Sequence, residues 1–263
     1  MQYKEININS LLNKITKKDT LFSGDYTADP YKNCEFGCLY CDSGLDKTIF
    51  IKTNAREILE EELEKNEKGT IIIGSVHDAY QNIEKKTKIT RDLLKIIKEY
   101  DFSCHILTKS DLILRDIDIL KDVKDCKVTI SLISLNENIS NIFEKKLPSP
   151  NKRLELIKKL NTENIKSGIA LMPIIPFITE SEFEEVIKQA KKNNSAYFLH
   201  KFLELKGDQK ACFLEFLKGY KPNLLQKYQQ IYNDSYYPNE EYINKQKNKI
   251  ESLCKRYKLK DKI

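Results

Sequence analysis

Six strand-like segments alternate with helix-like segments along the first 200 residues, and this order constrains the fold more than any other feature. The expected strands are 22–28, 70–76, 103–108, 127–134, 166–172 and 196–201, and the expected helices between them are 55–66, 88–100, 112–122, 150–161 and 180–192. Repeated strand–helix units predict a parallel sheet. Six units are too few to close the usual eight-stranded barrel. The sequence therefore predicts an α/β fold, an open and incomplete (β/α)6 TIM-like barrel.

The segments on either side of this core have a different character. Residues 1–22 predict a lead-in with a short helix near 8–15. Beyond residue 205 the buried strands cease, and helices are expected at 207–219, 223–233 and 240–257. We therefore expect three parts, which are a lead-in at 1–22, a barrel core at 23–204 and a helical C-terminal extension at 205–263.

Charge is concentrated in the extension. Residues 1–200 hold 31 basic and 31 acidic side chains, whereas residues 201–263 hold 14 and 8, so the whole net charge of +6 lies in the extension. A basic surface attracts polyanions, although a lysine excess is usually only a solvated face. No run approaches the roughly 18 apolar residues of a membrane span, and the N-terminus has no apolar signal core. We expect a cytoplasmic protein with no membrane partner.

Three cysteines, Cys34, Cys38 and Cys41, follow the first expected strand in a Cys-x3-Cys-x2-Cys run. Thiolates so close together can bind one metal centre, and a [4Fe–4S] cluster with three cysteine ligands keeps an open position on its fourth iron. The amino and carboxylate groups of S-adenosylmethionine can fill that position. Zinc sites usually pair such a run with a second cysteine pair or histidines, and the three histidines here are scattered. Zinc and unliganded core thiols are the alternatives.

Polar and small residues follow the expected strands, at the edge where chemistry occurs in parallel barrels. Lys109 can pair with a carboxylate as a point charge, and Gly74, followed by Ser75, lets the backbone approach a ligand closely. Ser131 can bond to a carboxylate or a ribose hydroxyl. Asp78 can take an amino group or hydroxyls, and Met172 can pack on adenine.

Each of these side chains also has a purely structural interpretation. Lys109 is otherwise a surface lysine, Ser131 a hydroxyl bonded to its own sheet, Asp78 a cap for the following turn and Met172 a core residue. The four cysteines outside the run are dispersed and are interpreted as core or surface thiols.

Several short segments together resemble the radical S-adenosylmethionine proteins related to spore photoproduct lyase. These segments are Asp29–Tyr31 before the cysteine run, Val76–Glu84, Ile106–Leu112 with Arg115 and Asp116, Pro148–Pro150 with Arg153 and Leu154, and Met172–Pro176. The similarity spans about residues 25–180. The resemblance implies a radical SAM type of partial barrel and a cluster on the three cysteines. It also implies cofactor contacts at Lys109 and Ser131, and Tyr40 stands where the family usually has an aromatic residue.

The sequence departs from the family pattern at several loop positions. The family usually has Asn in place of Asp29, Gly in place of Asn33, and Pro in place of Ala79 and Asn82. The lyase itself places a hydrogen-donating cysteine near the position of Gly74. This chain has no cysteine between Cys41 and Cys104, so it departs from that radical relay.

Two classes of function follow. The first is an enzyme that reductively cleaves S-adenosylmethionine to a 5′-deoxyadenosyl radical, which abstracts hydrogen from a substrate that is nucleic acid, a peptide or a small metabolite. Tyr80 and Cys104 are its candidate radical relays, and a flavodoxin or ferredoxin is its expected electron donor. The second is a non-catalytic, metal-stabilised module that binds nucleic acid through the basic extension. The polar residues at the strand ends argue against the second class.

Overall fold

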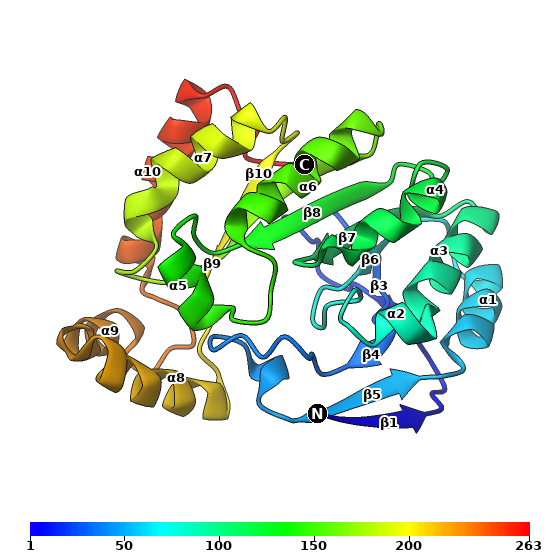
Figure 1. Cartoon of the computed structure of the whole chain (residues 1–263), viewed down its shortest axis with the longest axis horizontal. Coiled ribbons are helices and arrows are strands. Elements are labelled where there is room, and N and C mark those ends of the chain that lie inside the picture. The colour runs from blue at the N-terminus through cyan, green and yellow to red at the C-terminus, as the bar shows by residue number, and fades with distance from the viewer.

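A seven-stranded sheet forms the centre of the molecule (Figure 1). The computed structural model describes the backbone of residues 1–263 and the side chains of 1–43 and 45–263. The strand order is β10 (Phe198–Phe202), β9 (Lys166–Ile174), β8 (Lys127–Leu132), β7 (Ser103–Thr108), β6 (Thr70–Ile73), β3 (Tyr26–Thr27) and β2 (Asn13–Lys14). Neighbours from β10 to β3 pair in parallel, and β2 is antiparallel to β3. The predicted open sheet of six parallel strands is confirmed.

The parallel strands are buried because helices pack on the sheet. Strands that are covered on both faces are rich in branched apolar residues. The residues without exposed surface here include Ile71, Ile73, Ile106, Val128 and Ile130. The longer helices of the barrel are α1 (Ala55–Lys65), α3 (Ile89–Glu99), α6 (Pro150–Thr162) and α7 (Phe183–Lys192), and the shorter ones are α2 (Glu84–Thr87), α4 (Ile117–Leu120) and α5 (Glu137–Phe143).

The prediction of a lead-in helix near residues 8–15 is wrong. The N-terminal segment forms β1 (Gln2–Ile6) and β2 instead. The Asn54 side chain bonds both the N–H and the carbonyl of Ile8, and the Glu62 carboxylate accepts the N–H groups of Leu11 and Leu12. These distant partners take backbone groups that a helix would have paired within itself.

Three further elements are shorter than predicted, and the first of them is the strand expected at 70–76, which ends at Ile73 as β6. The strand expected at 22–28 is reduced to β3, because the Asp19 carboxylate accepts the N–H groups of Leu21, Phe22 and Gly24 and turns the chain there. The helix expected at 112–122 is a 3-10 segment, Asp111–Asp116, followed by α4. The Ser110 hydroxyl caps that 3-10 segment by accepting the N–H of Leu112.

A second, smaller sheet lies at the base of the view in Figure 1 and contains β1, β5 (Thr48–Lys52) and β4 (Tyr31–Lys32). Strand β5 pairs in parallel with β1 and antiparallel with β4. Because β4 precedes Cys34 and β5 follows Cys41, this sheet fixes both ends of the loop that carries the cysteines.

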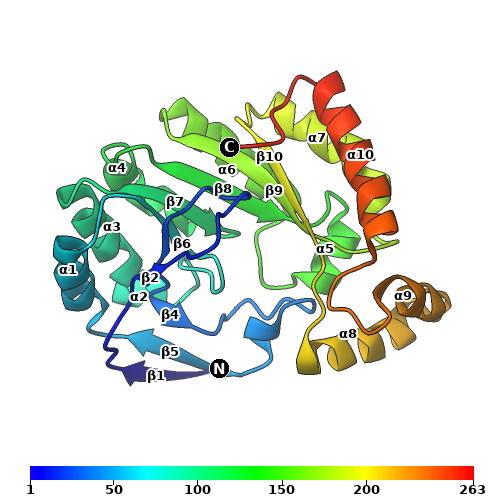
Figure 2. The same cartoon turned by 180° about the vertical axis from the view of Figure 1, so that it is seen from behind.

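The predicted helices of the extension are present as α8 (Gly207–Tyr220), α9 (Leu225–Tyr232) and α10 (Glu240–Arg256). Helix α10 packs against α7, and Figure 2 shows it beside β10 at the edge of the sheet. Helices α8 and α9 lie apart from α10. Helix α8 packs against the cysteine loop. Every helix in the described part of the chain is too short or too polar to span a lipid bilayer.

Candidate active site

One cavity at the carboxyl ends of the strands brings together all the predicted ligand and cofactor residues. Its volume is about 170 Å³, which is roughly ten times the space that one water molecule needs. It is lined by the three cysteines Cys34, Cys38 and Cys41, and by Tyr40, Gly74, Ser75, Asp78, Lys109, Ser131 and Met172. The structure therefore places the cysteine loop opposite the ends of β6 to β9, with space between them.

The cysteine loop is held by bonds to its own two ends and to the loop after β6. The Cys34 N–H donates to the carbonyl of Ser43, and the Cys41 N–H donates to the carbonyl of Cys38, each at 3.0 Å. Asn33 has a φ of 69°, a left-handed conformation that asparagine tolerates better than most residues. The Glu35 carboxylate accepts the N–H groups of Asn82 and Ile83.

The thiols of this loop are poorly exposed and lie near a cation. Burial raises the pKa of Cys34 and of Cys38 to about 12, while the ammonium of Lys109 acts in the opposite direction on both. Because metal ligands must be thiolates, the same cation would favour the ligating form. Among the described residues, no three His, Cys, Asp or Glu side chains form a site for a single metal ion.

Lys109 carries an unpaired charge on the cavity wall. Burial disfavours its ammonium form, yet Cys38, Glu144 and Asp78 together raise its pKa above the ordinary value. Within the described part of the chain, its Nζ atom makes no hydrogen bond or ion pair. A half-buried cation without a partner is suited to bind an anionic group of a ligand.

Asp78 is fully engaged with protein donors. Its carboxylate accepts the Thr108 hydroxyl at 2.8 Å, the Lys109 N–H at 2.8 Å and the Tyr80 N–H at 2.9 Å. These bonds cap the turn that follows β6 and tie it to the end of β7. The predicted contact between Asp78 and a cofactor stays a prediction.

Gly74 and Ser131 shape the wall opposite the cysteines. Gly74 has a φ of +84°, and a Cβ atom there would lie 2.3 Å from the carbonyl oxygen of Leu107. The Gly74 N–H donates to the Asp29 carboxylate at 3.0 Å. The Ser131 hydroxyl donates to the Met172 carbonyl at 2.9 Å and thereby joins the ends of β8 and β9.

The two predicted radical relays lie elsewhere. Tyr80 and Cys104 are 1% and 0% exposed and belong to the main hydrophobic core, not to the cavity wall. Burial raises the pKa of both side chains well above the ordinary values. Because neither side chain lines the cavity, the positions of Tyr80 and Cys104 do not support the prediction that they relay a radical.

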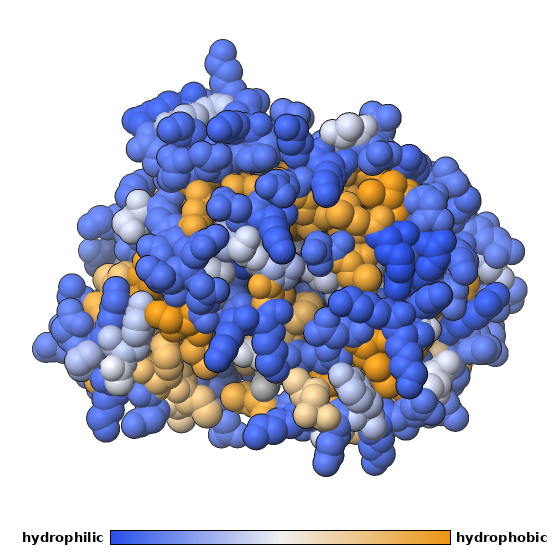
Figure 3. Space-filling model, in the orientation of Figure 1, coloured by the Kyte–Doolittle hydropathy of each residue, from blue (hydrophilic) through white to orange (hydrophobic). Residues whose placement is uncertain are grey.

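The extension supplies a part of the site that the sequence did not predict. Phe213 and Leu217 of α8 form a second hydrophobic cluster with Phe36, Cys38 and Tyr40, and the Gln209 side chain donates to the Tyr40 carbonyl. The apolar positions of α8 were visible in the sequence, but nothing in them indicated which segment they cover. In Figure 3 hydrophobic residues reach the surface beside α5 and α8, and also over a larger area around β8, α4 and α6.

Comparisons with known proteins found a matching family, similar sequences and similar folds. The family described as the Radical SAM superfamily matches residues 29–190. An uncharacterised protein of Methanocaldococcus jannaschii is 31% identical over 245 residues, which cover 87% of this chain and 90% of that protein. An uncharacterised protein of Mycobacterium tuberculosis is 22% identical over an alignment of 277 residues, which covers 98% of this chain and 81% of that protein.

Solved structures show the same fold. A mutant of spore photoproduct lyase with a dinucleoside spore photoproduct has a TM-score of 0.70 and 13% identity, covering 96% of this chain and 79% of the lyase. SuiB of Streptococcus suis, bound to S-adenosylmethionine, has a TM-score of 0.53 and 17% identity. The match covers 75% of this chain and 47% of SuiB.

Proposed function

Because the chain belongs to the Radical SAM superfamily, whose members use a [4Fe–4S] cluster and S-adenosylmethionine, we propose that it is an enzyme that acts on nucleic acid from the cavity described above. A bound cluster, once reduced by one electron, would supply with S-adenosylmethionine the cleavage of the sulfonium C–S bond into methionine and a 5′-deoxyadenosyl radical, and this radical would take a hydrogen atom from the substrate. The protein supplies ligands, orientation and shielding.

The observation that carries this proposal is the unpaired Lys109 facing three thiols across one cavity. Cys34, Cys38 and Cys41 would hold the cluster, and the Lys109 ammonium would hold the carboxylate of S-adenosylmethionine. Gly74 would offer the ligand a stretch of backbone without a side chain, since a Cβ atom there would meet the Leu107 carbonyl of β7. Met172 would pack on the adenine, and Phe36 on the cysteine side would help to exclude water.

The experiment for this step is anaerobic reconstitution with iron and sulfide. We expect about four irons per chain, and 5′-deoxyadenosine on reduction with S-adenosylmethionine by a chemical reductant or by a flavodoxin or ferredoxin, which we propose as the electron donor. Cys38→Ala should abolish this product, whereas Cys212→Ala, at an exposed cysteine of α8, should retain it. Bound zinc without 5′-deoxyadenosine would instead favour the non-catalytic module.

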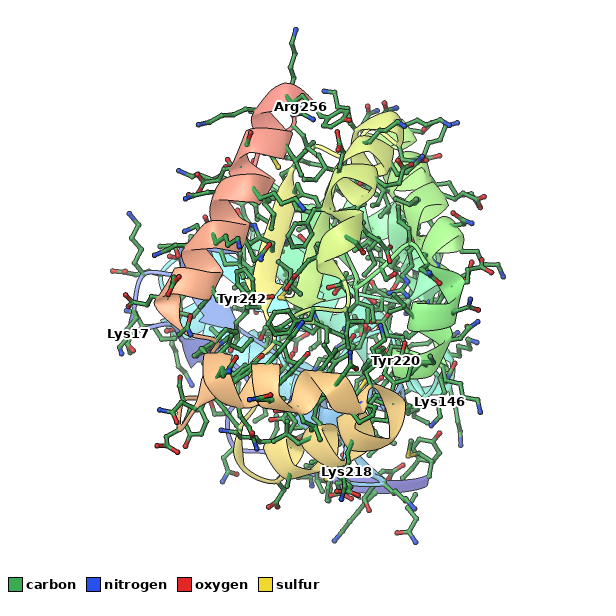
Figure 4. All side chains as sticks on the ribbon, turned by 90° about the vertical axis from the view of Figure 1, so that its left-hand side faces the viewer. Lys17, Lys146, Lys218, Tyr220, Tyr242 and Arg256 are labelled. Atoms are coloured by element: carbon green, nitrogen blue, oxygen red, sulfur yellow. The ribbon has the colours of Figure 1, made fainter. Side chains whose placement is uncertain are left out.

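Nucleic acid as the substrate is supported by the basic charge of the extension, which holds the whole net charge of +6. Residues 240–263 carry +4 of it, whereas α8, the helix that packs against the cysteine loop, holds two basic and two acidic side chains. Figure 4 shows Lys146, Lys218 and Tyr220 at the same end of the molecule, around the end of α8. Tyr220 is half-buried and packs on Phe143 and Phe216, so the lysines are the groups that would contact a phosphate backbone.

A peptide substrate is the second candidate, because SuiB in a solved structure is bound to its precursor peptide, with a TM-score of 0.50 to this chain. Deuterium transfer separates the two. Deuterated oligonucleotides should pass the label into 5′-deoxyadenosine in the presence of the reduced enzyme. Transfer from deuterated peptides and none from oligonucleotides would refute the nucleic-acid assignment.

A further inference from the structure

A buried ion pair outside the cavity connects its two walls. Arg153, near the start of α6, and Glu144, just after α5, have fully buried side chains that meet at 2.6 Å. Neither residue lines the cavity. Two buried charges are costly to desolvate and usually need a complete set of hydrogen bonds, so the partners of this pair indicate what it holds in place.

Arg153 bonds to three separate segments. Its Nε donates to the carbonyl of Pro148 at 3.1 Å, and one terminal nitrogen donates to the carbonyl of Ser131 at 2.9 Å. The other terminal nitrogen donates to the Ser140 hydroxyl at 3.2 Å and to Glu144. The planar fork of arginine can serve such divergent acceptors at once, whereas the single ammonium of lysine cannot.

Glu144 carries the connection to the cysteine loop. One carboxylate oxygen accepts Arg153, and the other accepts the hydroxyl of Tyr40. Tyr40 lies between Cys38 and Cys41, and the neighbouring Leu39 N–H donates to the carbonyl of Phe143 at 3.0 Å. The cysteine loop is thus bonded to the end of α5 through both a side chain and the backbone.

The bonds of Arg153 therefore reach both sides of the cavity. Through Ser131 they fix the end of β8, and through Glu144 and Tyr40 they fix the cysteine loop. We propose that Arg153 is a positioning residue, which sets the separation between the cluster-binding loop and the S-adenosylmethionine-binding wall without touching either group. The inference rests on the proposed function, because it assigns S-adenosylmethionine to that wall.

The decisive variant removes both charges, Arg153→Met with Glu144→Leu. Apolar replacement of a whole buried pair is often neutral for stability, so this double variant should fold and take up about four irons per chain. We expect its dissociation constant for S-adenosylmethionine to rise at least tenfold. The change that S-adenosylmethionine causes in the EPR spectrum of the reduced cluster should also diminish. Leu160→Ala, a core truncation at the far end of the same helix, controls for general destabilisation and should leave both readouts unchanged.

A cycle with Tyr40→Phe tests the route of the connection. Removing this hydroxyl alone should weaken binding of S-adenosylmethionine about fivefold in the wild-type background, the value of one hydrogen bond. Its effect should be clearly smaller in the Arg153→Met and Glu144→Leu background, because the hydroxyl has lost Glu144 and keeps only the Cys38 thiol as a partner. Additive effects, or wild-type affinity in the double variant, would overturn the proposal. If the double variant does not fold, an unchanged affinity of Tyr40→Phe overturns it as well.

Binding of S-adenosylmethionine by the wild-type protein distinguishes a failure of this inference from a failure of the proposed function. If the iron-loaded wild type does not bind S-adenosylmethionine, the proposed function itself fails. If the wild type binds it and the variants bind it equally well, only the positioning role of Arg153 fails.

Discussion

Gly74→Ala is expected to destabilise the protein by displacing the wall of the cavity. Gly74 directly follows β6 with a φ of +84°, and an added Cβ would lie 2.3 Å from the backbone oxygen of Leu107 on β7. A backbone carbonyl of the neighbouring strand cannot swing aside as a flexible side chain can. The end of β6 and the end of β7 must therefore separate.

The magnitude follows from three contributions. A left-handed conformation costs an alanine about 1–2 kcal/mol, and overpacking a tight contact adds about 1–3 kcal/mol. The lower conformational entropy of the unfolded alanine chain offsets about 0.4–1 kcal/mol. The free energy of unfolding should fall by about 1–5 kcal/mol as the net of these contributions.

Urea unfolding of the metal-free protein measures this change, and Gly219→Ala is the matched control. Gly219 lies in α8 with no atom within 4 Å of the added Cβ, so alanine there should stabilise the helix by up to about 1 kcal/mol. The two substitutions are chemically identical and should have opposite signs. A Gly74→Ala protein as stable as wild type would refute the argument from the close approach to Leu107.

Three further predictions concern pH, packing and salt. Burial lowers the pKa of His105 to about 4. The unfolded chain therefore binds the proton first as the pH falls, so the contribution of His105 to stability, complete above about pH 6.5, should fall by about 2 kcal/mol at pH 5. Burial also lowers the pKa of His77 to about 4 and raises that of Asp29 to about 6, so the His105→Gln variant is the reference: urea unfolding at pH 7 and 5 should show the wild type losing about 2 kcal/mol more than this variant. Phe213→Ala empties a fully buried site beneath the cysteine loop and should cost about 3–5 kcal/mol; a chelator should also extract iron from it faster than from Leu160→Ala. Binding of a single-stranded oligonucleotide, followed by fluorescence anisotropy, should weaken with a linear dependence on the logarithm of salt concentration; an affinity independent of salt would contradict binding through the basic extension.

The sequence predicted those parts of the site that local pattern determines. Alternating strands and helices imply parallel strands whose carboxyl ends converge. The strand-end residues Gly74, Lys109, Ser131 and Met172 could therefore be placed around one cavity before the structure was known. The cysteine spacing likewise indicated a single loop facing that edge.

Features that depend on distant partners were not predictable in this way. The segment near 8–15 has an amphipathic pattern, but Asn54 and Glu62 hold it in extended form. Cys104 lies on β7 among the strands that reach the cavity, yet alternate residues of a strand face opposite sides, and this one lies in the core. The contact between α8 and the cysteine loop joins Gln209 to Tyr40, which are 169 positions apart, and no local pattern records such a pairing.

The support of the cysteine loop by α8 has a consequence for the order of events during synthesis. The ribosome makes Cys41 early, but it makes the helix that forms the floor of the loop only after the barrel strands are complete. A nascent chain that already carries all three thiols still lacks Gln209 and Phe213 beneath them. Iron delivered during translation would meet an unsupported loop, so maturation of the metal centre should follow the completion of α8.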